Sequence, residues 1–382
     1  MAFLTSHTSH TSHTSHTSHT SHTSHAGLSS YSGASASPLL AEGLLGTLKA
    51  RGHWVLDAQG RPVSAAPLQT GVRGGWGRPG KINTDAEMRF FGMAALPRAY
   101  VCHSELMGLI DIDATGMHDA QVAVIKDRQG REIIRLKRPT YAMFKQQLDY
   151  VHQSSAQRAE RIAEILPQVY PADAWWSSVT GLRPERNPRT FEFLDAALNF
   201  TVTVVFRLKQ MAGCPRPVEY SAGIQPLLLT PGHDSWPSGH ATESFLIARI
   251  LSSFSNGSLR QHEGTSALGA SAEPLLRNTA RRIAENREVA GLHFPLDTAA
   301  GCMLGDTLAR FVMSYSARDA GLQAMSRSFD PAAHTGSAPD VTLTQLMDGL
   351  GTGDSAWEAF PATPSPQPCM HWLWTRAVAE WT

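Results

Sequence analysis

Apolar residues recur at helical spacing through most of the segment that begins at Asn187. The pattern covers four stretches, which are residues 187–212, the stretch after Ser238, residues 273–290 and residues 295–313. The first stretch starts with Asn187-Pro188, a favourable N-cap and first-turn pair, and Gly213 follows it as a helix end. This part of the chain is therefore predicted to be strongly helical.

The residues before this segment show a mixed pattern. In "WVLDAQGRPVSA" (54–65) and "VAVIKDRQGREIIRLKRP" (122–139), a polar turn that contains Gly separates two apolar runs, as in a β-hairpin. Residues 140–166 have helical spacing and predict one long helix. The expected fold is mainly α, with small accessory hairpins in the N-terminal region.

The N-terminal end of the chain has low complexity. Residues 5–25 are seven copies of Thr-Ser-His, and Ser/Gly/Ala-rich sequence continues to about Pro38. Because such a segment cannot form an apolar core, it is predicted to be disordered. Its histidines could bind a divalent metal or gain charge at mildly acidic pH. A repeat expansion or a tag without a catalytic role is the favoured interpretation.

These patterns divide the chain into four regions. They are a disordered tail (1–38), an N-terminal accessory region (39–182), a helical core (183–328) and a C-terminal segment (329–382). Trp372 and Trp374 are expected to pack the last region onto the core.

Composition and charge narrow the class of protein. Of 382 residues, 42% are apolar, and Lys+Arg and Asp+Glu both number 33, so no basic excess indicates a nucleic-acid or anionic-membrane surface. Polar residues interrupt the most apolar long stretch, residues 193–208, so no membrane span is expected. The first residues lack the basic and apolar regions of a secretory signal. A soluble, cytoplasmic protein is the default expectation, and export stays open.

The cysteines are few and far apart. They are Cys102, Cys214, Cys302 and Cys369, and they form no CxxC pair. Cys102-His103 and Cys369-x-His371 have a weak similarity to metal-binding pairs. Isolated thiols are expected, and the sequence assigns no disulfide.

One short stretch, "WPSGHATES" (236–244), places Ser238, Gly239 and His240 at a predicted helix start. A hydroxyl, free backbone N–H groups and an imidazole at that position suit the binding of an oxyanion. A loop with an ordinary helix cap is the alternative interpretation.

Two further motifs supply the charges that such a site needs. In "KQMAGCPRP", Lys209 and Arg216 flank the end of the first predicted helix, and a point-charge ammonium with a forked guanidinium suits an oxyanion. In "NREVAGLHFPLD", Arg287 precedes His293 and Asp297, which are four residues apart and can share one helix face. A carboxylate on one imidazole nitrogen fixes the tautomer and leaves the other nitrogen as a nucleophile or metal ligand. Solvated helix ends and a structural His-Asp pair are the alternatives.

The order Lys-x6-Arg-Pro, Pro-Ser-Gly-His and Arg-x5-His-x3-Asp, all within 89 residues, carries a resemblance. It resembles the superfamily that joins type 2 phosphatidic acid phosphatases, bacterial class A acid phosphatases and vanadium-dependent haloperoxidases. The resemblance covers residues 187–313 and implies a helical bundle with an anion site at helix ends. The family usually has Ser before the arginine of the third motif, whereas this chain has Asn286.

The resemblance implies a role for each motif residue. Three cations would hold the equatorial oxygens of the anion, namely Lys209, Arg216 and Arg287. Further hydrogen bonds would come from the Ser238 hydroxyl and the Gly239 N–H. His293, steadied by Asp297, would be the axial nucleophile, or the vanadium ligand if vanadate is bound. His240 would be the acid–base group.

The same cradle serves two chemistries, and the motifs alone do not separate them. A phosphatase would hydrolyse phosphate monoesters through a phosphohistidine. A vanadate-dependent haloperoxidase would oxidise bromide or iodide with hydrogen peroxide. A catalytically silent anion-binding relative is a third possibility. Substrates are thus halide and hydrogen peroxide, or a phosphate ester, and the oligomeric state is open.

The haloperoxidase is the favoured interpretation, for three reasons. A long region precedes the first motif, Ala241 follows the Pro-Ser-Gly-His motif, and His233 stands where bromide-oxidising relatives have a histidine near the halide. Two features oppose it. Only 46 residues separate His240 from Arg287, and Phe206 replaces the Trp of fungal chloroperoxidases, which puts chloride oxidation in doubt.

Overall fold

The computed structural model describes residues 55–56, 59, 62–63, 90, 92–116, 118–169, 173–260, 272–318, 324–334, 355–356 and 369–381. Contacts divide the chain into two units, Met1–Thr11 with Ser24–Arg98 and Ser12–Thr23 with Ala99–Thr382. The Thr-Ser-His tail lies outside the described residues. In the first unit, β1 (Val55–Leu56) and β2 (Pro62–Val63) form an antiparallel pair at the first predicted hairpin.

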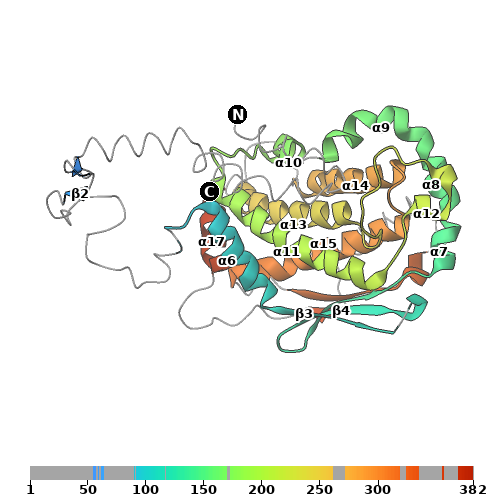
Figure 1. Cartoon of the computed structure of the whole chain (residues 1–382), viewed down its shortest axis with the longest axis horizontal. Coiled ribbons are helices and arrows are strands. Elements are labelled where there is room, and N and C mark those ends of the chain that lie inside the picture. Colours follow the sequence, from blue (N-terminus) through green and yellow to red (C-terminus); the bar gives the residue numbers. More distant parts are fainter. Residues whose placement is uncertain are drawn as a thin grey trace. The chain divides into compact units, whose positions relative to one another are not determined.

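The second unit is built on a bundle of long helices (Figure 1). These are α11 (Pro188–Ala212), α13 (Gly239–Arg260), α14 (Glu273–Val289) and α15 (Pro295–Ala317). Helix α13 is the centre of the bundle, because it packs against α11, α14 and α15. The predicted mainly α fold is therefore confirmed.

Two glycines let α15 approach the start of α13. A Cβ atom on Gly305 would lie 2.2 Å from the Thr242 carbonyl oxygen, and one on Gly301 would lie 2.7 Å from the Ser238 carbonyl oxygen. Both distances are far below van der Waals contact, so no larger residue fits without a backbone shift. This close approach brings the Pro-Ser-Gly-His segment against the first turns of α15.

Helix α11 ends as predicted but is capped differently. Gly213 has φ 56°, which favours glycine, and its N–H bonds to the Lys209 carbonyl. At the other end, the Asn187 side chain accepts from the Arg183 N–H and does not cap the helix. The Glu380 carboxylate accepts instead from the N–H groups of Arg189 and Thr190 at 2.7 and 2.8 Å.

The C-terminal helix α17 (Cys369–Val378) packs on α11 and α15. The Trp374 ring lies 5.3 Å from Phe193 and 4.9 Å from Phe254, so α17 contacts the aromatic side chains of the bundle. Trp372 instead lies under the guanidinium groups of Arg189 and Arg376.

The second unit also contains a five-stranded sheet with the strand order β3-β4-β5-β6-β7 (Figure 1). The second predicted hairpin is β4 (Val122–Asp127) with β5 (Glu132–Lys137). The sequence did not predict β3 (Ile110–Thr115), β6 (Met325–Phe329) or β7 (Ser355–Ala356). Strand β6 pairs in parallel with β5, so the sheet joins the N-terminal region to residues that follow the core.

The single helix predicted for residues 140–166 is wrong. The segment forms α7 (Tyr141–Gln146), α8 (Leu148–Ser154) and α9 (Arg158–Ile165), with a 3₁₀ turn between α8 and α9. Tertiary contacts override the local pattern. At one break, Gln147 accepts from the Leu296 N–H, and at the other, Arg158 donates to the carbonyls of Val289 and Gln225.

All four cysteines are free, from Cys102 in α6 (Ala95–Met107) to Cys369 at the start of α17. Three of the four are buried. None of the helices in the described part of the chain is long and apolar enough to cross a membrane. Short helical elements connect the rest, namely η3 (His118–Ala120), η4 (Ser155–Gln157), η5 (Pro167–Val169), α10 (Asp173–Thr180), α12 (Pro217–Tyr220), η6 (Ala222–Ile224) and η7 (Pro331–His334).

Candidate active site at the helix ends

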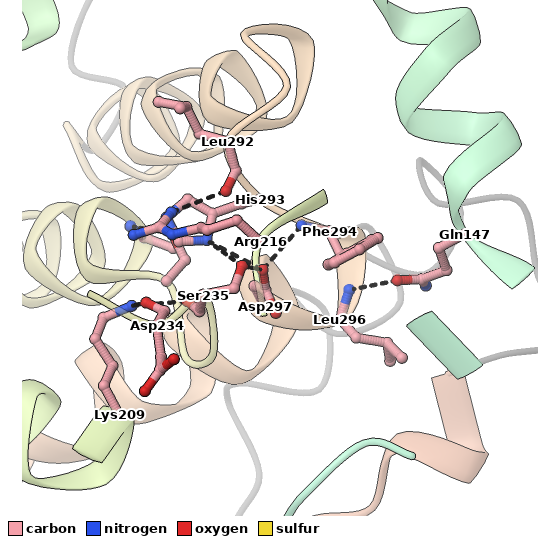
Figure 2. Close-up of polar contacts among 12 residues, drawn as sticks. Gln147, Lys209, Arg216, Asp234, Ser235, Leu292, His293, Phe294, Leu296 and Asp297 are labelled. Carbon is pink, nitrogen blue, oxygen red and sulfur yellow. Dashed lines mark hydrogen bonds and ion pairs between the residues drawn. The ribbon is translucent and has the colours of Figure 1, made fainter. Parts of the chain in front are cut away.

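The three sequence motifs meet where the bundle helices begin and end. Figure 2 shows Lys209 from the last turn of α11 and Arg216 from the following turn beside His293 and Asp297, which lie at the start of α15. All four side chains are buried, at 4% exposure or less. The fold thus gathers charged groups that are 88 positions apart in a site withdrawn from bulk water.

Lys209 anchors the loop that leads to the Pro-Ser-Gly-His motif. Its Nζ donates to the backbone carbonyls of Asp234 at 2.6 Å and Ser235 at 2.7 Å. Burial, with the positive charge of Arg216, holds the pKa of Lys209 well below its usual range. The ammonium is therefore oriented by neutral oxygens.

Arg216 lies between the loop and His293. Its guanidinium donates to the carbonyls of His233 at 3.1 Å and Leu292 at 2.8 Å. The Nη1 atom of Arg216 lies 3.0 Å from His293 Nε2 (Figure 2). Burial lowers the pKa of Arg216 to about 10, so the group stays charged at neutral pH.

Arg287 is fully buried at the end of α14. Its Nη2 donates to the Ile165 carbonyl and to Gln168 Oε1, both at 3.0 Å. Its Nε and Nη1 are buried and have no hydrogen-bond partner among the described residues. Burial lowers the pKa of Arg287 to about 9. Unpaired buried donors on a cation are costly, so this group has strong capacity to bind an anion.

His293 and Asp297 lie on one helix face, as their spacing predicts. His293 Nδ1 is 3.1 Å from Asp297 Oδ2, which also accepts from the Phe294 N–H at 2.9 Å and from the Ser235 hydroxyl. A carboxylate on Nδ1 and an arginine on Nε2 assign the proton to Nδ1. Nε2 therefore carries the lone pair.

Both groups have shifted pKa values. Burial, followed by the charges of Arg216 and Lys209, holds the pKa of His293 well below its usual range, so the imidazole is neutral. Burial raises the pKa of Asp297 to about 6, against the opposing effect of hydrogen bonds from Ser235 and the Phe294 amide. A neutral imidazole with a fixed tautomer can act as a nucleophile or a ligand.

The Pro-Ser-Gly-His motif forms the start of α13. The Ser238 N–H donates to the Asp297 carbonyl at 3.0 Å, and Ser238 Oγ accepts from the Ala241 N–H at 3.4 Å. The hydroxyl thus makes the cap contact that the sequence offered as an alternative. Gly239 is the first residue of α13, and His240 is buried and close enough for its charge to lower the pKa of His293.

His233 borders the cation cluster. Its Nδ1 is 3.1 Å from Arg216 Nη2, and its ring meets Phe206 edge-on at a centroid distance of 5.0 Å. The two residues that the sequence connected with halide chemistry are therefore in contact.

Two polar residues in the site were not predicted. Ser235 contacts both Asp297 and His293, at 3.4 Å from the ring nitrogen of His293. Its place three residues before Ser238 is the one signal in the sequence. Gln168 comes from outside the motifs, and no spacing connects it with Arg287.

The three cations share one property that decides the electrostatics. Neutral oxygens hold each of them, and within the described residues none forms an ion pair with a carboxylate. Asp297, which is buried and engaged with His293, and the half-buried Asp234 are the carboxylates whose charges act on both Lys209 and Arg216. Lys209 and Arg216 are therefore buried, preorganised donors beside His293 that favour an anion, and Arg287 carries buried donors without a partner among the described residues at the end of α14.

Comparison with known proteins agrees with this geometry. The family model of the PAP2 superfamily matches residues 193–320, a segment that holds all three motifs. The helical core is thus PAP2-like, and that superfamily includes both phosphatases and haloperoxidases. No curated protein matches the chain significantly.

Proposed function

We propose that this chain is a vanadate-dependent haloperoxidase that oxidises bromide or iodide with hydrogen peroxide. The observation that carries the proposal is the set of three buried cations, Lys209, Arg216 and Arg287, each held by neutral acceptors. No carboxylate of the described residues pairs with these groups, so their N–H donors stay available to stabilise the charge of a tetrahedral oxyanion. The contact of His233 with Arg216 and Phe206 supports a halide function at the edge of the same site.

The residues present fit vanadate. The buried N–H groups of Arg287 and the lone pair on His293 Nε2 match an anion that needs hydrogen-bond donors around it and one nitrogen ligand. Lys209, Arg216, Arg287, Ser238 and Gly239 would hold the oxygens, and His293 would bind the vanadium. Vanadate, when bound, would supply the Lewis acidity that activates peroxide toward the halide.

The chain's own residues would control protons and orientation. Asp297 keeps a proton on His293 Nδ1, so Nε2 carries the lone pair, which would turn from Arg216 Nη1 to the bound anion. Overall, one halide, one hydrogen peroxide and one proton give hypohalous acid and water, and His240 would supply that proton. His233 would contact the halide. Burial of the site limits the access of water.

A phosphatase is the second candidate, because a neutral His293 with its lone pair on Nε2 can also act as a nucleophile. In that reaction, a bond forms between His293 Nε2 and phosphorus while the bond from phosphorus to the ester oxygen breaks. His240 would give its proton to the leaving alkoxide, and water would then release phosphate from the histidine. The cation cluster would stabilise the charge on the equatorial oxygens in both steps.

A paired assay tests the proposal. Bromide and iodide oxidation by peroxide, and p-nitrophenyl phosphate hydrolysis, are measured on metal-stripped protein with and without orthovanadate. Halide oxidation that requires vanadate supports the haloperoxidase. Ester hydrolysis that vanadate inhibits, without halide oxidation, replaces it with the phosphatase. Neither activity, with retained vanadate binding, identifies a silent relative.

Two variants show whether the activity belongs to this site. His293→Ala should abolish it, whereas His152→Ala, an exposed histidine on α8, should leave it unchanged. Equal activities of the two variants would assign the reaction to another place.

A further inference from the structure

Gln168 is a buried residue that joins the accessory region to the site. It lies in η5 (Pro167–Val169), before the segment that matches the PAP2 model, and is 3% exposed. Its Oε1 accepts from Arg287 Nη2 and from Asn286 Nδ2, both at 3.0 Å. Two donors on one oxygen fix the orientation of the amide.

The end of α9 is held firmly in this position. Ile165, which offers its carbonyl to Arg287, is fully buried in an apolar cluster with Val289, Ala290 and Leu292. Arg287 Nη2 therefore has two acceptors, the Ile165 carbonyl and Gln168 Oε1, on a rigid element. With Nη2 fully engaged, the guanidinium plane is set, and Nε and Nη1 are the donors that remain.

A carboxylate lies close by but does not reach Arg287. Glu164 accepts from Arg282 at 2.7 and 2.8 Å and from Asn286 Nδ2 at 3.0 Å. Those contacts, with Arg282 as the largest cause, lower the pKa of Glu164 to about 2. Asn286 thus separates the anionic Glu164 from the buried Arg287, and Gln168 is the side chain that meets the arginine.

We propose that Gln168 is a positioning residue that orients the Arg287 guanidinium as a neutral acceptor and so leaves its charge available for the bound oxyanion. The inference rests on the proposed oxyanion-binding function. It accounts for Asn286, whose amide reaches Glu164 and Gln168 together, whereas a Ser side chain in that position carries one hydroxyl hydrogen.

The substitution Gln168→Glu separates positioning from simple structural support. The new carboxylate would still accept from Arg287 and Asn286, and it would pair with a cation that has no ion pair in the described part of the chain. The anion-free protein should therefore melt at a higher temperature than wild type. The new carboxylate would cancel the positive charge of Arg287, and the hydrogen bond from Arg287 to the oxyanion would become weaker. Oxyanion binding should therefore weaken about tenfold to a hundredfold.

The measurements are thermal unfolding without any anion and calorimetric titration with orthovanadate and with inorganic phosphate. Gln168→Met removes the acceptor and should lower both stability and affinity. Gln147→Met is the matched control, because the amide oxygen of Gln147 also accepts a hydrogen bond near the site, but from the Leu296 N–H and not from a cation of the described residues. It should bind both anions like the wild type.

The outcomes distinguish this inference from the proposed function. If the wild type binds an anion and Gln168→Glu binds it with the same affinity, the inference is overturned and the proposed function is not. Binding of neither anion by the wild type overturns the proposed function, and the melting comparison then decides the inference. A Gln168→Glu protein that is no more stable than wild type without anion overturns it, since Arg287 would then have no uncompensated charge.

Discussion

Replacing Asp297 by Asn should switch the tautomer of His293 and stop turnover with little change in fold. Asp297 Oδ2 accepts from His293 Nδ1 at 3.1 Å, from the Phe294 N–H at 2.9 Å and from the Ser235 hydroxyl. An Asn side chain retains one oxygen, which the Phe294 N–H can occupy, and brings an NH₂ group to the imidazole. With this NH₂ group donating to Nδ1, the proton moves to Nε2, where it faces Arg216 Nη1, and the lone pair points away from the anion site.

The loss expected from this change is large. A wrong tautomer in a hydrogen-bonded catalytic triad costs about 10⁴ in kcat, and we expect a similar loss of about 10³–10⁴ here. Each hydrogen bond to a buried charge contributes about 1.5–3 kcal/mol, so a moderate decrease in stability should accompany it. Turnover of the active substrate is measured per folded molecule, and ¹⁵N NMR locates the proton on His293.

Asp306→Asn is the control, since it lies on the same helix in an ion-pair network with Arg249, Arg310 and Arg327. It should lower the melting temperature and leave the tautomer and turnover per folded molecule unchanged. Asp297→Asn with more than about a tenth of wild-type turnover, or with its proton still on Nδ1, would refute the assigned role of Asp297.

Three further predictions concern the same site. The kcat/KM of the wild type should fall as the pH drops through about 6, because Asp297 becomes protonated there while the pKa of His293 is lower still. Comparing the pH profiles of wild type and Asp297→Asn tests this prediction. His233→Ala should reduce halide oxidation and leave phosphate-ester hydrolysis nearly unchanged; equal losses in the paired assay would contradict a halide role. Gly305→Ala should destabilise the protein by about 1–3 kcal/mol in denaturant melts, against nearly no change for Gly232→Ala, which has open space around its Cβ position.

The order of the motifs was sufficient to predict which distant residues meet. Lys209 and Arg287 lie in the last turns of their helices, and Arg216 comes after the end of α11. That Lys209 and Arg216 lie near His293 was predicted from the family resemblance that the motif order carries, because helical periodicity alone does not decide which helix ends meet. The i, i+4 spacing likewise anticipated the contact of His293 with Asp297. These are local features, and local features are visible in a single sequence.

Contacts set by tertiary packing were not visible. Glu380 caps α11 across 190 positions, and β6 pairs with β5 although the whole core separates them in the chain. The break at Gln147 likewise depends on an N–H of α15. Each contact depends on which surfaces meet after folding, and no periodicity encodes that choice.

The arrangement of acceptors explains why the accessory region matters to the chemistry. A buried arginine needs hydrogen-bond partners, and a carboxylate would satisfy it best, but a carboxylate would also cancel the field that attracts an anion. Backbone carbonyls solve this for Lys209 and Arg216, because the loops of the core supply them. Arg287 lies at the end of α14, and its acceptors come from α9 and η5. Ile165 and Gln168 therefore supply the acceptors of Arg287, and a PAP2-like segment cut off at its matched boundary would lack them.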